Sequence, residues 1–425
     1  MRLCIIALGT RGDVQPCVAL ARGLQLAGHD VCVASERFFE PLIRSRGLRY
    51  SPVCGNAHTA LQSDSMRTLL EGKRTSFFAR LFARTPRRPM DAGIAQRLAD
   101  CWRAGQDADA IIVSTLGLAM AYSVAEKLGR PLVRVFYSPP DLPLTRGFRP
   151  HPHLDRLTHA MFVQLTWSFF RSSMNRARRE VLGLPPLPAF KPHADLERKP
   201  WPRLCAYSAH VSPRPQAAAG DCHVTGYWFQ DEAPSWQPPR ALTDFLASGA
   251  PPVYVGFGSM ARRSPQTTTE LVVNALARAG QRGILATGWG GLTGAARSDQ
   301  ILLVDDVPHE WVFPRVAAVV HHGGSGTTAA GLRAGRPTVI LPFGLPDQPY
   351  WGDRVRALGA GPPPIQHKHL SVETLADTIR IAVGNREMRR RAEALGERIR
   401  AEDGVARAVE VLETSICPRG QTVSI

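Results

Sequence analysis

The sequence predicts an α/β protein made of two doubly wound domains that face each other across a cleft. In the first half, short apolar runs at residues 3–8, 31–34, 110–113 and 131–136 alternate with helical segments. Strands that are apolar on both faces and separated by helices are typical of a parallel sheet covered on both sides. The same alternation begins again after a proline-rich stretch at residues 233–240, which predicts a second domain in series.

The helices of the first half follow these strands directly. Their apolar residues recur with helical spacing at residues 14–27, 38–45 and 118–128. The period breaks down at residues 61–97 and 139–202, where Arg, Pro, Met and aromatic residues accumulate. Irregular insertions at the carboxyl ends of parallel strands are where such sheets bind ligands, so we expect the acceptor of any reaction there.

The second half repeats the pattern with a helix at residues 267–279 after its first strand. Helical periodicity also predicts two C-terminal helices, at residues 371–383 and 386–402. The strands are expected at residues 252–257, 282–287, 301–304, 316–320 and 338–341. The carboxyl edges of the two sheets would face one another and line the cleft.

Charge and cysteine usage restrict the function classes. The 425 residues carry 52 basic and 36 acidic side chains, a net charge of +16, but lack the modules and aromatic interleaving of a nucleic-acid binder. The excess is explained by a solvated basic face or, alternatively, by contact with an anionic membrane surface or substrate. Eight scattered cysteines without a C-x-x-C pair indicate a reducing cytoplasm and argue against structural zinc.

The first apolar run, at residues 3–8, is too short for a signal-peptide core or a membrane span. No other apolar stretch approaches the roughly 20 residues that cross a bilayer. We therefore expect a soluble cytoplasmic protein, with peripheral membrane contact as the open alternative.

The most informative stretch is Val-Val-His-His-Gly-Gly-Ser-Gly-Thr-Thr at residues 319–328. It reads as a buried strand, a glycine turn and a helix that begins at Ser325, whose first N–H groups would face a phosphate. The turn lacks the lysine of a P-loop and the three-glycine spacing of a dinucleotide fingerprint, so its charged group would be the imidazole of His322. The alternative is an ordinary strand-to-helix turn without a ligand.

A second glycine loop, Gly-Thr-Arg-Gly-Asp-Val-Gln-Pro, follows the first strand at residues 9–16. Asp13 would project from this loop into the cleft. Its residue type and position fit a helix N-cap, with Pro16 in the first turn. They also fit a general base that removes the proton of an acceptor hydroxyl.

Together, the two loops resemble those of GT-B nucleotide-sugar glycosyltransferases, in particular the sterol- and antibiotic-type enzymes of family 1. The resemblance extends to residues 256–260, 307–311 and 347–351. It implies two Rossmann-like domains and a last helix that returns to the first of them. The expected parts are an acceptor domain at 1–215, a linker at 216–240, a donor domain at 241–390, the returning helix at 391–415 and a tail at 416–425.

The resemblance implies that Asp13 is the base that activates the acceptor. Ser325 stands where alanine is common in the family. The expected donor-binding residues are Ser259, Val307, Pro308, His322, Gly324, Ser325, Gly326, Thr327, Asp347 and Gln348. The expected acceptor-binding residues are Thr10, Arg11, Phe162, Trp167 and Phe170, although the aromatic members of this set equally fit a helix packed on the core.

The expected reaction is an inverting transfer of a hexose, glucose from UDP-glucose, to a hydroxyl of a lipophilic small molecule such as a sterol, terpenoid or polyketide. No metal or other cofactor is expected. One alternative is a dTDP-deoxysugar transferase of antibiotic biosynthesis, and another is a non-catalytic nucleotide-sugar-binding or activator protein on the same fold. An NAD-dependent oxidoreductase is disfavoured because the loop of Gly9 and Gly12 lacks the third glycine of the fingerprint.

Overall fold

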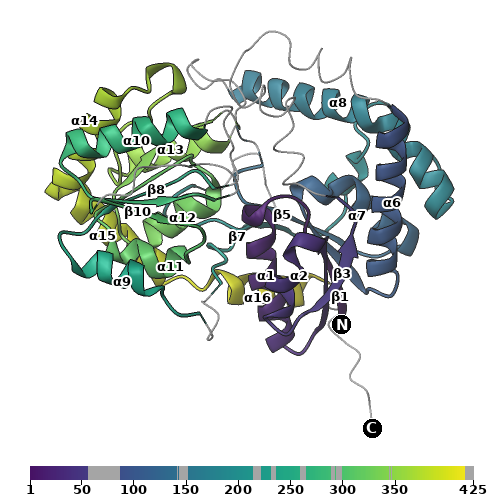
Figure 1. Ribbon diagram of the computed structural model, residues 1–425. Coiled ribbons are helices and arrows are strands. Elements are labelled where there is room, and N and C mark those ends of the chain that lie inside the picture. The colour runs from purple at the N-terminus through teal and green to yellow at the C-terminus, as the bar shows by residue number, and fades with distance from the viewer. Residues whose placement is uncertain are drawn as a thin grey trace.

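The computed structural model describes residues 1–55, 87–140, 142, 152–213, 222–230, 236–258, 265–288, 292, 299–343, 345 and 347–416. Of residues 87–91, 152–159, 162 and 265 it describes only the backbone. Two parallel sheets, each covered by helices on both faces, lie side by side (Figure 1). The predicted fold class is confirmed.

The first sheet has seven parallel strands in the order β3-β2-β1-β4-β5-β6-β7. Strand order reverses beside β1, so the carboxyl ends of β1 and β4 flank the point where such sheets bind ligands. The strands are β1 (Arg2–Ile6), β2 (Asp30–Glu36), β3 (Arg49–Val53), β4 (Ala110–Ser114), β5 (Leu132–Phe136), β6 (Arg203–Cys205) and β7 (Cys222–Val224). The helices are α1 (Arg11–Leu26), α2 (Glu40–Arg44), α6 (Arg87–Gly105), α7 (Leu118–Leu128) and α8 (Pro152–Ala177).

Three strands and one helix, α6, of this half were not expected from the sequence, and α8 was expected only as an alternative. β3 has one fully buried residue, Val53, and β6 and β7 are three residues long, so none has a run of apolar residues to mark it. α6 begins, and α8 lies, in the stretches where we expected no regular period. In α8, Met161, Leu165 and Phe170 are exposed, so its apolar residues are not confined to one buried face.

The second sheet has five parallel strands in the order β10-β9-β8-β11-β12. Its strands are β8 (Val253–Gly256), β9 (Gly283–Ala286), β10 (Ile301–Val304), β11 (Ala318–His321) and β12 (Thr338–Ile340), close to the predicted positions. One face is covered by α10 (Pro265–Ala279) and α14 (Val372–Gly384). The other is covered by α9 (Arg240–Ala247), α11 (His309–Val312) and α12 (Ser325–Arg333), while α13 (Asp347–Ala357) follows β12.

The last two helices pack against different halves. α15 (Arg386–Arg400) contacts α12, whereas α16 (Gly404–Ile416) lies beside α1 of the first half (Figure 1). The close approach of α1 and α16 requires Gly23, because a Cβ there would lie 2.3 Å from Val405 Cγ1. The predicted helix at 391–415 is thus two helices, separated by a break at residues 401–403.

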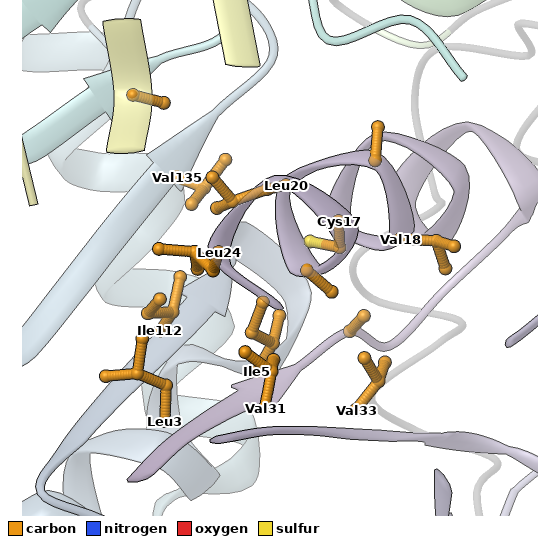
Figure 2. Packing of buried hydrophobic residues seen from close by; sticks show 14 of the residues in the cluster. Leu3, Ile5, Cys17, Val18, Leu20, Leu24, Val31, Val33, Ile112 and Val135 are labelled. Atoms are coloured by element: carbon orange, nitrogen blue, oxygen red, sulfur yellow. The ribbon is translucent and has the colours of Figure 1, made fainter. Parts of the chain in front are cut away.

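The core of the first half consists of two apolar layers. Figure 2 shows one of them, where Cys17, Leu20 and Leu24 of α1 point toward strand residues such as Ile5 and Ile112. α6, α7 and the end of α8 cover the opposite face of the sheet. Across the helices of the described residues, none is long and apolar enough to span a membrane.

A further apolar cluster contains residues of both halves and joins them. Trp351 of α13 is fully buried and its ring lies 6.2 Å from that of Tyr207, which follows β6. Leu332 of α12 and Ile399 of α15 belong to the same cluster. Apolar burial of this kind fixes the carboxyl edges of the two sheets relative to one another.

Two leucines near the end of α1 test this packing. Leu24 is fully buried, whereas Leu26, two residues further on, is 72% exposed. We expect Leu24→Ala to lower the free energy of unfolding by about 2–5 kcal/mol, because it removes buried methyl groups and leaves a cavity. Leu26→Ala, the matched control, should change it by less than about 0.5 kcal/mol in urea unfolding followed by circular dichroism. Equal effects would contradict the packing of α1.

Candidate active site

The C-terminal glycine turn lies between β11 and α12. β11 ends at His321, which is fully buried, and α12 begins at Ser325. Gly323 has φ +91°, and a Cβ there would lie 2.8 Å from a methyl carbon of β12. A Cβ at Gly324 would lie 2.5 Å from Nε2 of His322. Both glycines are needed because the imidazole and β12 leave no room for side chains.

α12 presents backbone N–H groups at this turn. Those of Ser325, Gly326 and Thr327 precede the first intrahelical bond, in which the N–H of Thr328 donates to the carbonyl oxygen of Gly324 at 3.0 Å. Within the described part of the chain, no side chain caps this end of the helix. An uncapped helix N-terminus carries a partial positive charge and binds anions, so the turn has the geometry of a phosphate site.

The two histidines of the turn differ in role. His321 accepts a hydrogen bond at Nδ1 from the N–H of Gly323 at 3.0 Å, which fixes the turn. His322 lies against Gly324, and burial lowers the pKa of its imidazole to about 4. Burial thus favours the neutral imidazole over the expected charged one, and the positive potential of the turn comes from the helix terminus.

Ser325 makes a contact that its position in the motif does not reveal. Its Oγ donates a hydrogen bond to the backbone oxygen of Tyr137, which follows β5 of the first sheet, at 2.8 Å. The hydroxyl that we expected to bind phosphate therefore connects the two halves.

Asp13 lies in the first turn of α1, half-buried. Its Oδ2 accepts hydrogen bonds from the N–H of Thr10 at 2.8 Å and from the Thr10 hydroxyl at 3.0 Å. Burial raises the pKa of Asp13, the bonds from Thr10 oppose that change, and the charge of Glu36 adds to it. Gly9, at φ +127°, leaves room for the carboxylate, since a Cβ there would lie 2.5 Å from Oδ2.

This geometry resolves part of the choice between cap and base. Thr10, not Asp13, is the N-cap of α1, and Asp13 is the third helical residue, in a capping-box arrangement. Both hydrogen bonds fall on Oδ2, so Oδ1 accepts none from the described residues. One oxygen of the carboxylate completes the capping box, and the other can accept a hydrogen bond or a proton from a ligand.

Asp347, in the second half, is close enough to Asp13 for the two charges to interact. Burial raises the pKa of Asp347 to about 6, and the negative charge of Asp13 contributes to that rise. Two carboxylates that are 334 positions apart in the sequence therefore repel each other in the folded protein. Gln348 is 1% exposed and its Oε1 accepts from the N–H of Phe343 at 2.6 Å, so this oxygen is committed to the turn before α13.

The segment expected to meet the nucleotide base is mostly core. Val307 is 7% exposed and belongs to the apolar cluster beneath α11. The carbonyl oxygen of Pro308 accepts from the N–H groups of Trp311 and Val312, so this oxygen belongs to the start of α11. Ser259 lies outside the described residues.

Arg11, which was expected to bind the acceptor, forms an ion pair with a residue of the second half. Its Nη1 lies 2.8 Å from both carboxylate oxygens of Asp306, just before the Val-Pro segment. The side chains are 47% and 71% exposed, so this pair contributes at most about 1 kcal/mol. The ion pair of Arg11 and Asp306 is a second polar contact between the two halves, besides the hydrogen bond from Ser325 to Tyr137.

Of the aromatic residues of α8 that were expected at the acceptor site, Trp167 lies in the core. Trp167 is 6% exposed, packs in the core of the first half and donates from Nε1 to the oxygen of Pro188 at 2.9 Å. Trp167 therefore fits the alternative given above, a helix packed on the core. Phe170 is 40% exposed on the same helix, and the side chain of Phe162 lies outside the described residues.

Sequence reasoning missed two exposed apolar side chains at the edge that carries Asp13. Leu116, 67% exposed, follows β4, and its Cδ1 would lie 2.8 Å from a Cβ on Gly9. Phe38, 58% exposed, follows β2, the neighbour of β1 on the other side. The signal that could have found them is positional: each comes directly after a buried strand, at the carboxyl edge.

Among the residues that the structure describes, no group of three or more His, Cys, Asp or Glu side chains is placed to hold a metal ion. The groups described above for this site are the N-terminus of α12, the imidazole of His322 and the carboxylates of Asp13 and Asp347.

Comparisons with known proteins agree with this arrangement. Residues 3–142 match the glycosyltransferase family 28 N-terminal domain, and residues 292–414 match the erythromycin biosynthesis protein CIII-like C-terminal domain. A solved structure, the glycosyltransferase of kitacinnamycin, superposes with a TM-score of 0.69 at 19% identity and covers 97% of this chain and 98% of that one. The fold is that of the GT-B glycosyltransferases.

Relatives with higher sequence identity define the family more narrowly. A sterol 3-beta-glucosyltransferase of Arabidopsis thaliana is 35% identical over 441 residues, which cover 100% of this chain and 67% of the plant protein. A sterol 3-beta-glucosyltransferase of Emericella nidulans is 34% identical over 436 residues, which cover 97% of this chain and 30% of the fungal protein. The chain belongs to the GT-B glycosyltransferase family that contains these sterol 3-beta-glucosyltransferases, which confirms the resemblance drawn from the two glycine loops.

The neutral His322 predicts an acid-sensitive fold. Histidine titrates near 6.5 in an unfolded chain and at about 4 here, so between these values the unfolded state binds the extra proton. The free energy of unfolding should therefore fall as pH decreases from 6.5 toward 4. We expect His322→Gln to remove up to about 1.4 kcal/mol per pH unit of this slope, measured by urea unfolding at several pH values. Superimposable profiles would contradict a buried neutral imidazole.

Proposed function

We propose that this protein transfers glucose from UDP-glucose to the hydroxyl group of a sterol-like acceptor with inversion at the anomeric carbon. The observation that carries the proposal is that Asp13 of the first half interacts electrostatically with Asp347 of the second half, while Ser325 of the α12 turn is hydrogen-bonded to Tyr137, which in turn contacts Asp13. The names of the relatives, which align with this chain over its full or nearly full length, support both glucose and a sterol.

In this mechanism the acceptor hydroxyl lies beside Asp13, on the face of the sugar opposite the diphosphate. Asp13 accepts the hydroxyl proton at Oδ1 while the acceptor oxygen forms a bond to the anomeric carbon. The bond from that carbon to the diphosphate oxygen breaks, and UDP leaves with the electron pair. The N–H groups at the start of α12 stabilise the charge that develops on the diphosphate.

The electrostatics of the site suit this sequence of events. Burial raises the pKa of Asp13, which makes it a stronger base than an exposed carboxylate. A neutral His322 donates a hydrogen bond to an anion without a proton having to be taken up first. Asp347, at the start of α13, would accept hydrogen bonds from sugar hydroxyls.

The exposed apolar residues at the Asp13 edge support a lipophilic acceptor. Leu116 and Phe38 flank the loop that carries the base and expose 67% and 58% of their surface. Exposed large apolar side chains beside a polar catalytic group fit a ligand with an apolar body and one hydroxyl. A sterol has this shape.

Asp13→Asn tests the reaction and the donor site together. We expect transfer of glucose to a 3-hydroxysterol to be abolished, because the amide cannot accept the proton. UDP binding should persist, since the hydrogen bonds that the Asp13 side chain accepts within the described residues come from Thr10 and none comes from the α12 turn. Thermal unfolding at 100 times the dissociation constant of UDP should then show about 2.7 kcal/mol of stabilisation in both proteins.

The same thermal assay with dTDP, GDP and NAD identifies the donor class. Stabilisation by dTDP in place of UDP would contradict UDP-glucose and favour a deoxysugar donor. Stabilisation by NAD alone, or an Asp13→Asn variant with unchanged turnover, would contradict the proposed reaction.

Leu116→Gln tests the acceptor site. A buried leucine side chain contributes roughly 1.5–3 kcal/mol, so loss of its contact with a sterol should raise the KM for the acceptor at least tenfold. The KM for the nucleotide sugar should stay within about twofold, because Leu116 lies on the first half. Leu26→Gln is the matched control, since Leu26 is equally exposed but lies at the far end of α1. An unchanged acceptor KM would exclude Leu116 from the acceptor site.

A further inference from the structure

The Ser325 hydroxyl cannot serve two acceptors with its single proton. It donates to the backbone oxygen of Tyr137 at 2.8 Å, across 188 positions of sequence. A serine hydroxyl has one O–H donor, so while this bond exists Ser325 does not donate to a phosphate oxygen. Its position in the glycine motif predicts a phosphate contact, and the structure gives it a different partner.

Tyr137 carries the connection on to the base. Its phenol donates to the backbone oxygen of Asp13 at 2.7 Å and lies 3.1 Å from Sγ of Cys17. Burial raises the pKa of the Tyr137 phenol well above its usual range, so the phenol remains a donor at any physiological pH. One residue thus contacts the donor turn through its backbone and the first turn of α1 through its side chain.

The contact through Tyr137 joins two sides that each carry a carboxylate, and it is itself neutral. Asp13 and Asp347 have like charges, and the charge of Asp13 contributes, after burial, to the raised pKa of Asp347. Repulsion favours an open arrangement in which the base lies farther from the donor. Hydrogen bonds from Ser325 and Tyr137 work against this displacement without adding a charge to the site.

We propose that Ser325 and Tyr137 are positioning residues that hold Asp13 at a fixed distance from the donor turn, and that Ser325 is not a phosphate ligand. This inference rests on the proposed function for its kinetic consequences, but its structural part does not. A small displacement of a general base lowers the rate of the chemical step strongly while leaving donor affinity unchanged.

Ser325→Ala and Tyr137→Phe remove one hydrogen bond each. We expect kcat to fall about tenfold in both, with the KM for the nucleotide sugar and the calorimetric Kd for UDP within about twofold of the wild-type values. The double variant should be no slower than the slower single variant, because both changes interrupt the same connection. Ser325→Thr, which keeps the hydroxyl, should restore most of the rate.

Ser212→Ala is the matched control. Ser212 is hydrogen-bonded to the hydroxyl of Tyr350 and so also connects the two halves, but at a place without contact to Asp13. It should leave kcat within about twofold. If it lowers kcat as much as Ser325→Ala does, the effect is a general loosening of the interface and the positioning role is refuted.

Hydrogen exchange gives a readout that does not depend on turnover. Amides in a peptide covering residues 9–17 should exchange at least fivefold faster in Ser325→Ala and Tyr137→Phe than in the wild type and in Ser212→Ala. If the wild type has no transferase activity but this pattern holds, the proposed function fails and the positioning contact stands. A UDP Kd raised fivefold or more in Ser325→Ala, with Tyr137→Phe unaffected, would make Ser325 a phosphate ligand and overturn the inference.

Discussion

The apolar contact between the two halves is the constraint on which the site depends. Trp351 is fully buried against Tyr207 and the helices α12 and α15, so the carboxyl edges of the two sheets are held face to face. Neither half contains the site by itself: the base comes from the loop after β1, and the anion-binding turn comes from the loop after β11. Because a buried tryptophan contributes several kcal/mol, the relative position of the halves is not left to the weaker polar contacts.

Polar contacts add to this apolar contact between the two halves. Arg11 is paired with Asp306, and Ser325 donates to the backbone of Tyr137. The first contact is exposed and screened by salt, whereas the second is partly buried and neutral. A neutral, directional contact is better suited to hold a carboxylate near another carboxylate, since it adds no charge that would change the pKa of either.

Burial shifts the pKa values of the titratable groups at the site. It lowers the pKa of His322 to about 4, which favours the neutral imidazole, so the fixed positive potential comes from the backbone at the start of α12, and it raises the pKa of Asp347 to about 6. Backbone N–H groups have no protonation equilibrium near neutral pH, and they remain oriented whether or not a ligand is present. A donor that carries a diphosphate would therefore meet a site already arranged for it.

The sequence by itself determined the elements near the two glycine loops and the class of protein. Local rules suffice there: buried strands such as β1 and β11 are short apolar runs, and Gly9 and Gly323 adopt backbone conformations that other residues avoid. Asp13 and the α12 turn could be predicted as partners because each directly follows a central strand, at the edge where parallel sheets bind ligands.

Only the tertiary structure decided what individual side chains contact. Ser325 donates to Tyr137, 188 positions away, and Trp167 is buried in the core instead of lining a pocket. α8, with apolar residues on several faces, gave no clear period, and Leu116 and Phe38 carried no motif. The physical reason is common to all of them: hydrogen bonds and burial between distant residues depend on how the two halves pack together, and that packing is not encoded in any local pattern of residues.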